Sequence, residues 1–273
     1  NSDFRPTPRG RALAAVDCAD KTRDWSSSNL SRKELTVAAL IRENYNHHFP
    51  DEQECKNMKI LNSFGPNPRM LRMFLAEKGL KMDMVEYDLL AGENREPGYL
   101  NKNPGGQMPA LELDNGTILA ETVVICDYLE ELYPTPALIG TNAQERAEAR
   151  MWNRRIEQKI TGYIYDGFQF GEGIDMFKNR RRCLPEAADG LKASAQDGLA
   201  WLDKQMEGKK FICGDRITIA DLVLYCCTNF SAGVGQTIDS SLENVNAWSN
   251  RIDQRPSAEA SLHPAAETVG MKG

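Results

Sequence analysis

Two polar side chains stand around a sharp turn near residue 65 and are the first candidates for chemistry. In the stretch LNSFGPNPRML, residues 61–71, Ser63 offers a hydroxyl before the turn and Asn67 offers a side-chain amide. The turn itself holds no Cys, Tyr or His. An apolar run precedes it and a helix-like run follows, with prolines suited to the first helical position. Because a helix N-terminus has unpaired N–H groups, the pattern predicts a site built on hydrogen-bond donors rather than on a reactive side chain.

Histidine and cysteine exclude several other mechanisms. The three histidines are His47, His48 and His263, and we expect all three to lie outside the folded core. A Ser-His-Asp triad, a Cys-His pair or a histidine-ligated metal would need one inside the core, so we expect no metal site. The seven cysteines are scattered, with no C-x-x-C spacing and an odd total. This usage favours a reducing compartment, and we expect the cytoplasm.

The elements that must position the turn begin at Met58, the first methionine. The patterns predict a strand over 60–63, a helix over 68–79 that ends at Gly79, and a strand over 82–88 with period two. Two short strand-like runs, PALELD and TILAE, flank Asn115-Gly116, which is a strong hairpin signal. A helix over 121–132 follows. The order is β-α-β, a loop, β-β, α, which predicts a small α/β layer with one hairpin edge.

The pattern changes after the proline-rich joint 133–140. Residues 142–262 read as successive helices with almost no strand signal. Thr218 and Asp221 have the spacing of a capping box, which we favour over a catalytic aspartate. The neighbours Cys226 and Cys227 lie in the same predicted helix, so we expect both to be small core residues. The second half is therefore predicted to be all-helical.

The length and the net charge of the chain limit the number of domains and the kinds of partner. The chain has 273 residues, enough for one large or two ordinary domains. Its net charge of -6 argues against a nucleic-acid groove. No apolar run approaches the roughly 20 residues that cross a bilayer, so we expect no membrane partner. Residues 1–57 are mixed in charge and rich in Ser, Arg and Asp, and we expect them to be an extension outside the fold.

Two longer motifs resemble the cytosolic glutathione transferases. GGQMPALELDNGTILAETVVICDYLEELYP is similar to the glutathione-binding core of that family, and GDRITIADLVLY to the capping box of its helical domain. The resemblance runs from about Met58 to about Pro264. The GPNP turn and the loop AGENREPGYLNKN resemble a fungal and bacterial branch whose members lack the usual catalytic Tyr, Ser or Cys. The implied fold is α/β plus all-α: a thioredoxin-like domain at 58–137, a helical bundle domain at 138–264, and a tail at 265–273.

The resemblance also implies where glutathione binds. Pro109 matches the family's cis proline, which leaves the Met108 backbone free to pair with the extended tripeptide. Thr122 opens a helix whose N-terminus suits the γ-glutamyl carboxylate, and Glu121 suits the ammonium group; the family usually has Ser where this chain has Thr122. The predicted glutathione-binding residues are Asn94, Arg95, Gln107, Met108, Pro109, Glu121 and Thr122. The family's loop more often has His or Lys where this chain has Asn94 and Arg95.

Activation of the glutathione thiol departs from the family pattern. The usual activating position falls on Gly65, which has no side chain to donate. Helix N-termini and donors lower a thiol pKa, so the helix start, backbone amides, and Asn67 or a water would serve instead. The predicted catalytic residues are Asn67 and Ser63, although Asn67 could be only a helix cap and Ser63 only a buried strand residue. In the related fungal branch, groups of the helical domain assist through water. The matching stretch here has Gln169 and Phe170 in place of the usual His, which leaves Tyr163, Tyr165 or Gln169 as candidates for this role.

The function that this resemblance implies is glutathione transfer to a small hydrophobic electrophile. Glutathione would be a co-substrate, with no permanently bound cofactor, and a homodimer is expected. The predicted residues of the electrophile pocket are Phe64, Tyr163, Tyr165 and Gln169. One alternative is a glutathione-dependent disulfide reductase or peroxidase, which the absence of a Cys at position 65 disfavours. Another is a non-catalytic assembly domain, which would not need a glutathione site.

Overall fold

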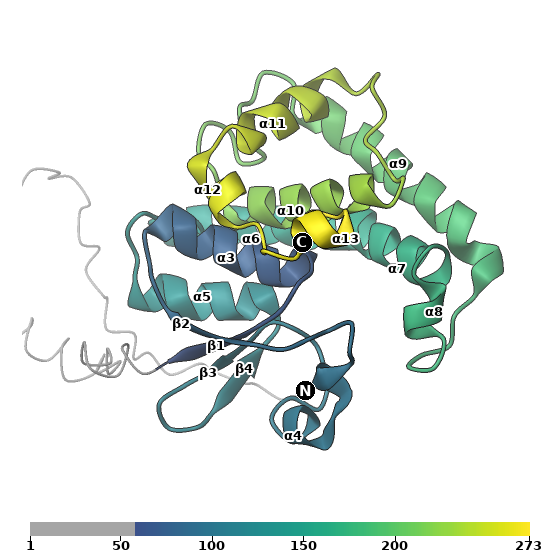
Figure 1. Ribbon diagram of the computed structural model, residues 1–273. Helices are drawn as coiled ribbons and strands as arrows, with labels where there is room; N and C mark the ends of the chain where they lie inside the picture. The colour runs from purple at the N-terminus through teal and green to yellow at the C-terminus, as the bar shows by residue number, and fades with distance from the viewer. Residues whose placement is uncertain (1–57) are drawn as a thin grey trace, which may run out of the picture. The chain divides into compact units, whose positions relative to one another are not determined.

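A computed structural model describes residues 58–273, and Figure 1 shows the arrangement of their elements. The first half is a four-stranded sheet with helices. Its elements are β1 Lys59–Asn62, α3 Pro66–Lys78, β2 Asp83–Glu86, η1 Glu93–Arg95, α4 Pro97–Leu100, β3 Ala110–Glu112, β4 Ile118–Ala120 and α5 Thr122–Leu132. The predictions for residues 1–57, for His47 and for His48 fall outside the described residues.

The sheet has the strand order β2-β1-β3-β4. β1 pairs parallel with β2 and antiparallel with β3, and β3 pairs antiparallel with β4. Side chains alternate between the two faces, as the period of a strand requires. Ile60 and Leu111 join the main core with α3 and α5, whereas Leu61 and Ala110 pack with Tyr99 in a smaller cluster. In Figure 1, α3 and α5 lie on one side of the strands and α4 on the other.

The predicted hairpin is confirmed between β3 and β4. Ala110 pairs with Ala120 in its register, and Gly116 has a φ of 80°, which glycine adopts readily. The Asn115 side-chain oxygen accepts a hydrogen bond from the Thr117 N–H at 2.9 Å, so the turn is closed locally. The hairpin matters for the site because β4 leads directly into α5.

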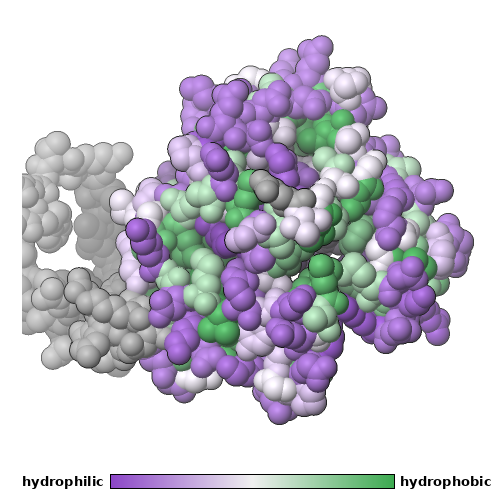
Figure 2. Space-filling model, in the orientation of Figure 1, coloured by the Kyte–Doolittle hydropathy of each residue, from purple (hydrophilic) through white to green (hydrophobic). Residues whose placement is uncertain are grey.

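The second half is helical, as predicted. Its elements are α6 Ala143–Ile156, the π-helix η2 Glu157–Thr161, α7 Gly162–Phe170, α8 Ile174–Phe177, η3 Pro185–Ala187, α9 Ala188–Gln205, α10 Ile219–Gly233, α11 Glu243–Asp253, α12 Pro256–Ala260 and α13 Ala266–Val269. One hydrophobic cluster continues from α3 and α5 into α6, α9 and α10. On the face in Figure 2, apolar residues gather where the two halves meet. The two halves therefore share a core.

The capping box of α10 is confirmed. The Thr218 N–H donates to an Asp221 carboxylate oxygen at 2.7 Å. The other Asp221 oxygen accepts from the Ile212 N–H and from the Trp248 indole, both at 2.9 Å. Asp221 is fully buried, and Cys226 and Cys227 are buried free thiols in the same helix. Asp221 thus has a structural role in joining α10 to its neighbours.

The joint between the halves is held by a buried ion pair. Lys78, at the end of α3, lies 2.6 Å from Glu130 and donates to the carbonyls of Tyr133 and Pro136 at 2.7 Å. The other Glu130 oxygen accepts from the N–H groups of Leu138 and Ile139. Because both charges are hydrogen-bonded as well as paired, their desolvation is compensated.

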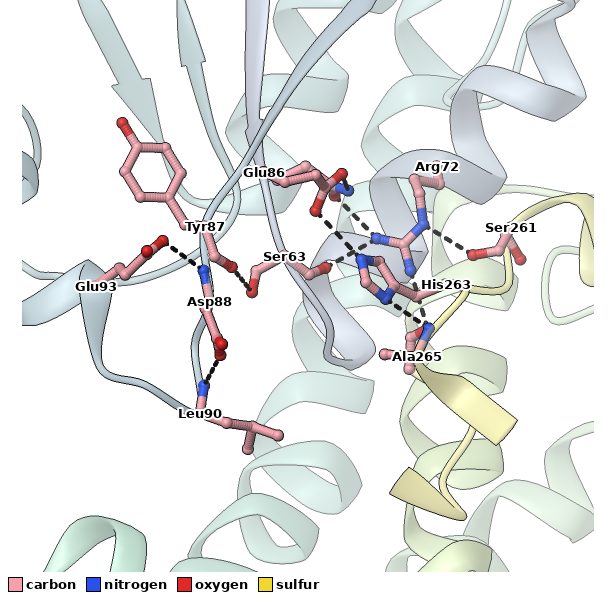
Figure 3. Close-up of polar contacts among 12 residues, drawn as sticks. Ser63, Arg72, Glu86, Tyr87, Asp88, Leu90, Glu93, Ser261, His263 and Ala265 are labelled. Carbon is pink, nitrogen blue, oxygen red and sulfur yellow. Dashed lines mark hydrogen bonds and ion pairs between the residues drawn. The ribbon is translucent and has the colours of Figure 1, made fainter. Parts of the chain in front are cut away.

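The end of the described chain corrects one prediction. His263 lies within the fold, contrary to our expectation: its ring packs edge-on against Phe64 and contacts Glu86 at 3.2 Å. The segment expected as a tail includes α13 and returns to α3, where the buried guanidinium of Arg72 donates to the carbonyls of Ser261 and Gly273 at 2.9 Å (Figure 3). Burial lowers the pKa of Arg72 to about 10, so it stays charged at neutral pH.

Candidate functional site

A cavity of about 420 Å³ lies where the sheet half meets the helical half. Two helix N-termini open into it, that of α3 through Pro66 and Asn67 and that of α5 through Glu121 and Thr122. The remaining walls are Met70, Val123, Val124, Glu157, Thr161, Gly162, Tyr165 and Val223. Unpaired backbone N–H groups and positive dipole ends at both helix starts favour anionic groups in a ligand.

The α3 N-terminus has few donors of its own. Gly65 precedes it with a φ of 136°, a conformation that favours glycine. Pro66 and Pro68 have no N–H, and the Arg69 N–H bonds the Gly65 carbonyl at 3.0 Å. The Asn67 N–H is therefore the one amide of the first turn left for a ligand. The first turn also has no acidic side chain, so nothing there competes with an external anion.

Asn67 adds a side-chain donor at the same place. The Tyr165 hydroxyl, on α7, donates to the Asn67 side-chain oxygen at 3.1 Å. Among the described residues, the Asn67 Nδ2 group has no hydrogen-bond partner. Burial, and next the neighbouring Cys227 thiol, raise the pKa of Tyr165 well above its usual value. The tyrosine hydroxyl is thus protonated at neutral pH and able to donate.

The α5 N-terminus presents a second set of donors. Glu121 stands before it with a φ of 69°, and no other non-glycine residue in 58–273 has a positive φ. Such a conformation is costly and is often kept at binding sites. The Ile125 N–H already bonds the Glu121 carbonyl, which leaves the N–H groups of Thr122, Val123 and Val124 for a ligand. The Thr122 hydroxyl lies beside them on the cavity wall.

The Met108–Pro109 peptide bond is cis, as predicted. It comes directly before β3, whose register pairs Ala110 with Ala120. Ala120 is the last residue of β4, and α5 begins two residues later at Thr122. Met108 itself takes part in no ladder pair of the sheet. Its backbone therefore has no strand partner in the sheet, as the added-strand role predicted for it requires.

Ser63 lies outside this cavity. Its side chain is buried at 1% exposure, and its hydroxyl donates to the Tyr87 carbonyl at 2.6 Å, which ties the end of β1 to the end of β2 (Figure 3). This is the structural role that we weighed against a catalytic one. The catalytic prediction for Ser63 gains no support from its position.

The loop residues predicted to bind the glycyl end of glutathione form hydrogen bonds within their own loop region. The buried Asn94 amide donates to the Gly106 carbonyl at 2.6 Å, and Arg95 donates to the Gly105 carbonyl at 3.2 Å. Burial lowers the pKa of Arg95, with nearby Arg180 adding to the effect. Gln107 has an exposed side chain and a backbone carbonyl held by Tyr99 and Asn103. The three residues lie off the cavity wall, and their binding roles stay predictions.

Of the predicted electrophile pocket, only Tyr165 lines the cavity. Phe64 is buried against His263 and the backbone of Gly273. Tyr163 is 37% exposed, and Gln169 accepts a hydrogen bond from Arg181 at 2.6 Å. The roles of Phe64, Tyr163 and Gln169 therefore stay predictions as well.

The sequence analysis missed Glu157 and Thr161 on the cavity wall. Both belong to η2, a π-helical turn between α6 and α7. Such turns are frequent at functional sites, because they change which side chains face a neighbour. Helical periodicity gives no signal for them, so the sequence could not have placed these residues.

Within residues 58–273, no three His, Cys, Asp or Glu side chains are grouped in a way that could hold a metal ion. In the same part of the chain, no helix combines the length and apolar character of a membrane span. The cavity wall combines two carboxylates, those of Glu121 and Glu157, with hydroxyl groups and apolar side chains.

Comparison with known proteins agrees with this fold. The family models for the N-terminal and C-terminal domains of glutathione S-transferase match residues 64–132 and 185–251. Glutathione S-transferase 2 of Saccharomyces cerevisiae is 30% identical over 205 residues, which cover 72% of this chain and 86% of the relative. GstA of Escherichia coli is 28% identical over 75% of this chain and 97% of its own length.

Solved structures give the same result. A glutathione S-transferase domain-containing protein from Marinobacter aquaeolei is 33% identical, with a TM-score of 0.69, over 73% of this chain and 98% of that one. Gtt2 from Saccharomyces cerevisiae is 29% identical, with a TM-score of 0.68, over 75% of this chain and all of that one. The chain belongs to the glutathione S-transferase family, and the predicted thioredoxin-like and helical fold is confirmed.

Proposed function

We propose that this protein transfers glutathione to small hydrophobic electrophiles. The observation that carries the proposal is the cavity that joins the N-termini of α3 and α5. Glutathione has one carboxylate at its γ-glutamyl end and a thiol near its middle, so an extended molecule presents an anion to each helix. The family membership supports glutathione as the co-substrate.

Each end of the cavity has its own role in the proposal. The N–H groups and hydroxyl of Thr122 bind the γ-glutamyl carboxylate, Glu121 pairs with the ammonium group, and the Met108 backbone pairs with the peptide. Asn94, Arg95 and Gln107 are proposed for the glycyl end. The thiol lies at the α3 N-terminus, between the N–H and the Nδ2 group of Asn67. Charge-assisted hydrogen bonds there lower its pKa.

The reaction itself needs no reactive side chain. The bound thiol loses its proton to water, and the thiolate forms a sulfur–carbon bond with the electrophile. In a substitution the leaving group departs with the electron pair, and in an addition the product takes up a proton. Tyr165, Met70 and Val223 supply apolar surface beside the thiolate. In the same proposal the protein acts in the cytoplasm as a homodimer.

Asn67→Ala tests the proposal. The probe electrophile is an activated aryl halide, and glutathione is saturating. The wild-type kcat/KM for the aryl halide should rise with pH, and the apparent pKa of this rise should lie well below the roughly 8.5 of a free thiol. We expect the variant to shift this apparent pKa upward by about one pH unit, because a hydrogen bond to a charged group is lost. An apparent pKa that does not move would exclude Asn67 as the donor, and no turnover in either protein would reject transferase activity.

Reduction of disulfides by glutathione is the second candidate that the sequence left open. No cysteine lines the cavity, and Gly65 stands before α3. A mixed disulfide with the protein therefore has no partner at the cavity wall. We expect activity on a disulfide substrate to be far below activity on the aryl halide.

A further inference from the structure

One hydrogen bond connects the helical half to the α3 N-terminus inside the cavity. Tyr165 and Asn67 are 98 residues apart in sequence, and the hydroxyl–oxygen distance is 3.1 Å. Both residues line the same cavity wall. From the sequence, Tyr165 was predicted for the electrophile pocket and was one candidate for assisting the thiol through water, but its contact with Asn67 was not predicted.

The direction of the bond determines what Asn67 can offer. A carboxamide has an acceptor oxygen and a donor NH2 group on opposite sides of one carbon. When Tyr165 donates to the oxygen, the NH2 group points the other way. A flipped amide would aim its oxygen at the bound anion, which repels it. The tyrosine and the anion therefore favour the same amide orientation.

We propose that Tyr165 is a positioning residue, which orients the Asn67 amide so that its NH2 group faces the glutathione thiolate. This inference rests on the proposed function, because it assumes that Asn67 donates to the thiolate. Tyr165 then acts through Asn67 and not on the sulfur. The chain thereby uses a contact between its two halves to set the pKa of the thiol.

The surroundings of Tyr165 support a donor role. The side chain is half-buried and its ring is packed against the main core. Burial keeps its hydroxyl protonated across the working pH range, as its raised pKa indicates. A group that stays protonated donates at every pH at which the thiol ionises. The Tyr165 hydroxyl thus keeps the proton that it donates to Asn67 while the thiol ionises.

A double-mutant cycle separates this role from a direct one. The proteins are the full-length wild type, Tyr165→Phe, Asn67→Ala and the double variant, each with saturating glutathione and no electrophile. The readout is the pKa of the bound thiol, followed by the ultraviolet absorbance of the thiolate. Tyr165→Phe keeps the ring and removes the hydroxyl. Tyr87→Phe is the matched control, because Tyr87 is a half-buried tyrosine that packs on Tyr99 and does not line the cavity.

We expect Asn67→Ala to raise the thiol pKa by about one unit and Tyr165→Phe by about half a unit, because a free amide donates in only part of its orientations. The double variant should match Asn67→Ala, since Tyr165 has nothing left to orient. Tyr87→Phe should leave the pKa unchanged.

Other outcomes overturn the inference in distinguishable ways. If Asn67→Ala raises the pKa and Tyr165→Phe does not, Tyr165 is not a positioning residue and the proposed function stands. If Tyr165→Phe has its full effect in the Asn67→Ala background, the tyrosine acts on the thiol directly. If the wild type does not bind glutathione, the proposed function fails first.

A second measurement covers a variant that does not fold. In 15N-labelled wild type, the Asn67 side-chain NH2 signals should move downfield when glutathione binds and should not move with S-methylglutathione, which has no thiolate. Equal shifts with both compounds would overturn the orientation proposed for Asn67.

Discussion

At the scale of single residues, the site depends on donors held in fixed directions. In the proposed function, Thr122 binds the carboxylate end of glutathione, because its N–H opens α5 and its hydroxyl lies on the cavity wall. In the same proposal, Asn67 donates hydrogen bonds to the glutathione thiolate at the N-terminus of α3. Neither residue needs an unusual protonation state. The proposed chemistry therefore depends on backbone geometry and on these two side chains.

Thr122→Val should weaken glutathione binding without changing the chemical step. The substitution keeps the shape and removes one hydroxyl, which contributes about 1 kcal/mol to binding. We expect KM for glutathione to rise roughly 5-fold, with kcat within about twofold of the wild type. Steady-state kinetics at saturating electrophile measure both constants.

Thr117→Val is the control for this substitution, because Thr117 is an exposed hairpin residue outside the cavity. It should leave KM unchanged. A Thr122→Val protein with normal KM and a large loss in kcat would contradict a binding role for the hydroxyl.

At the scale of elements, the sequence patterns predicted those turns and helix starts that depend on residues close together in the chain. Asn115-Gly116 predicted the β3–β4 hairpin, and Thr218 with Asp221 predicted the start of α10. Ser63 shows where prediction from local patterns fails. Whether its hydroxyl points into a site or onto a strand depends on Tyr87, 24 residues further along the chain.

Two other features had no local signal. The π-helical turn η2 interrupts a helical pattern whose periodicity looks continuous, so Glu157 could not be placed at the cavity. Arg69 and Arg72 are typical surface residues by type, yet both are buried and donate to the carbonyls of the last residues. His263 was misplaced for the same reason, since the sequence does not show which segment covers Phe64.

Asp221→Ala should destabilise the helical half strongly. The carboxylate accepts hydrogen bonds from the N–H groups of Ile212 and Thr218 and from the Trp248 indole. Its removal leaves these buried donors unpaired, and we expect the free energy of unfolding to fall by about 3–5 kcal/mol. Urea denaturation measures the change.

The matched control is Asp215→Ala, because Asp215 is exposed and its ion pair with Lys210, at 3.5 Å, lies on the surface. Surface changes of this kind stay within about 0.5 kcal/mol. Equal stability of the two variants would show that Asp221 does not join α10 to its neighbours.

At the scale of the whole molecule, the cavity exists only while the two halves stay packed. α3 belongs to the sheet half and is held by α12 of the helical half. The Arg255 guanidinium donates two hydrogen bonds to Glu77, at 2.6 and 2.7 Å, and Ser257 donates a third at 2.5 Å. The contact keeps the α3 helix, and with it Asn67, in place against the helices that carry Tyr165.

This contact makes part of the stability depend on pH. Burial alone would raise the pKa of Glu77, but the hydrogen bonds from Arg255 and Ser257 outweigh it and the pKa is lowered. A carboxylate with a lowered pKa in the folded state stabilises the fold above its unfolded pKa of about 4.5. This stabilisation is lost as the pH falls through the folded value.

We therefore expect Glu77→Gln to be less stable than the wild type at pH 7, by about 1–2 kcal/mol, with the difference disappearing toward pH 3. Unfolding curves of both proteins at intervals between these pH values test this. A difference that stays constant with pH would mean that the Glu77 charge contributes nothing.

The central claim is that this fold binds glutathione and ionises its thiol without a reactive side chain. The most direct test adds glutathione to the full-length protein at pH 7 and records the ultraviolet difference spectrum, with S-methylglutathione as the reference. The account predicts a saturable thiolate absorbance with glutathione only. Saturable binding without thiolate absorbance at pH 7 would contradict it.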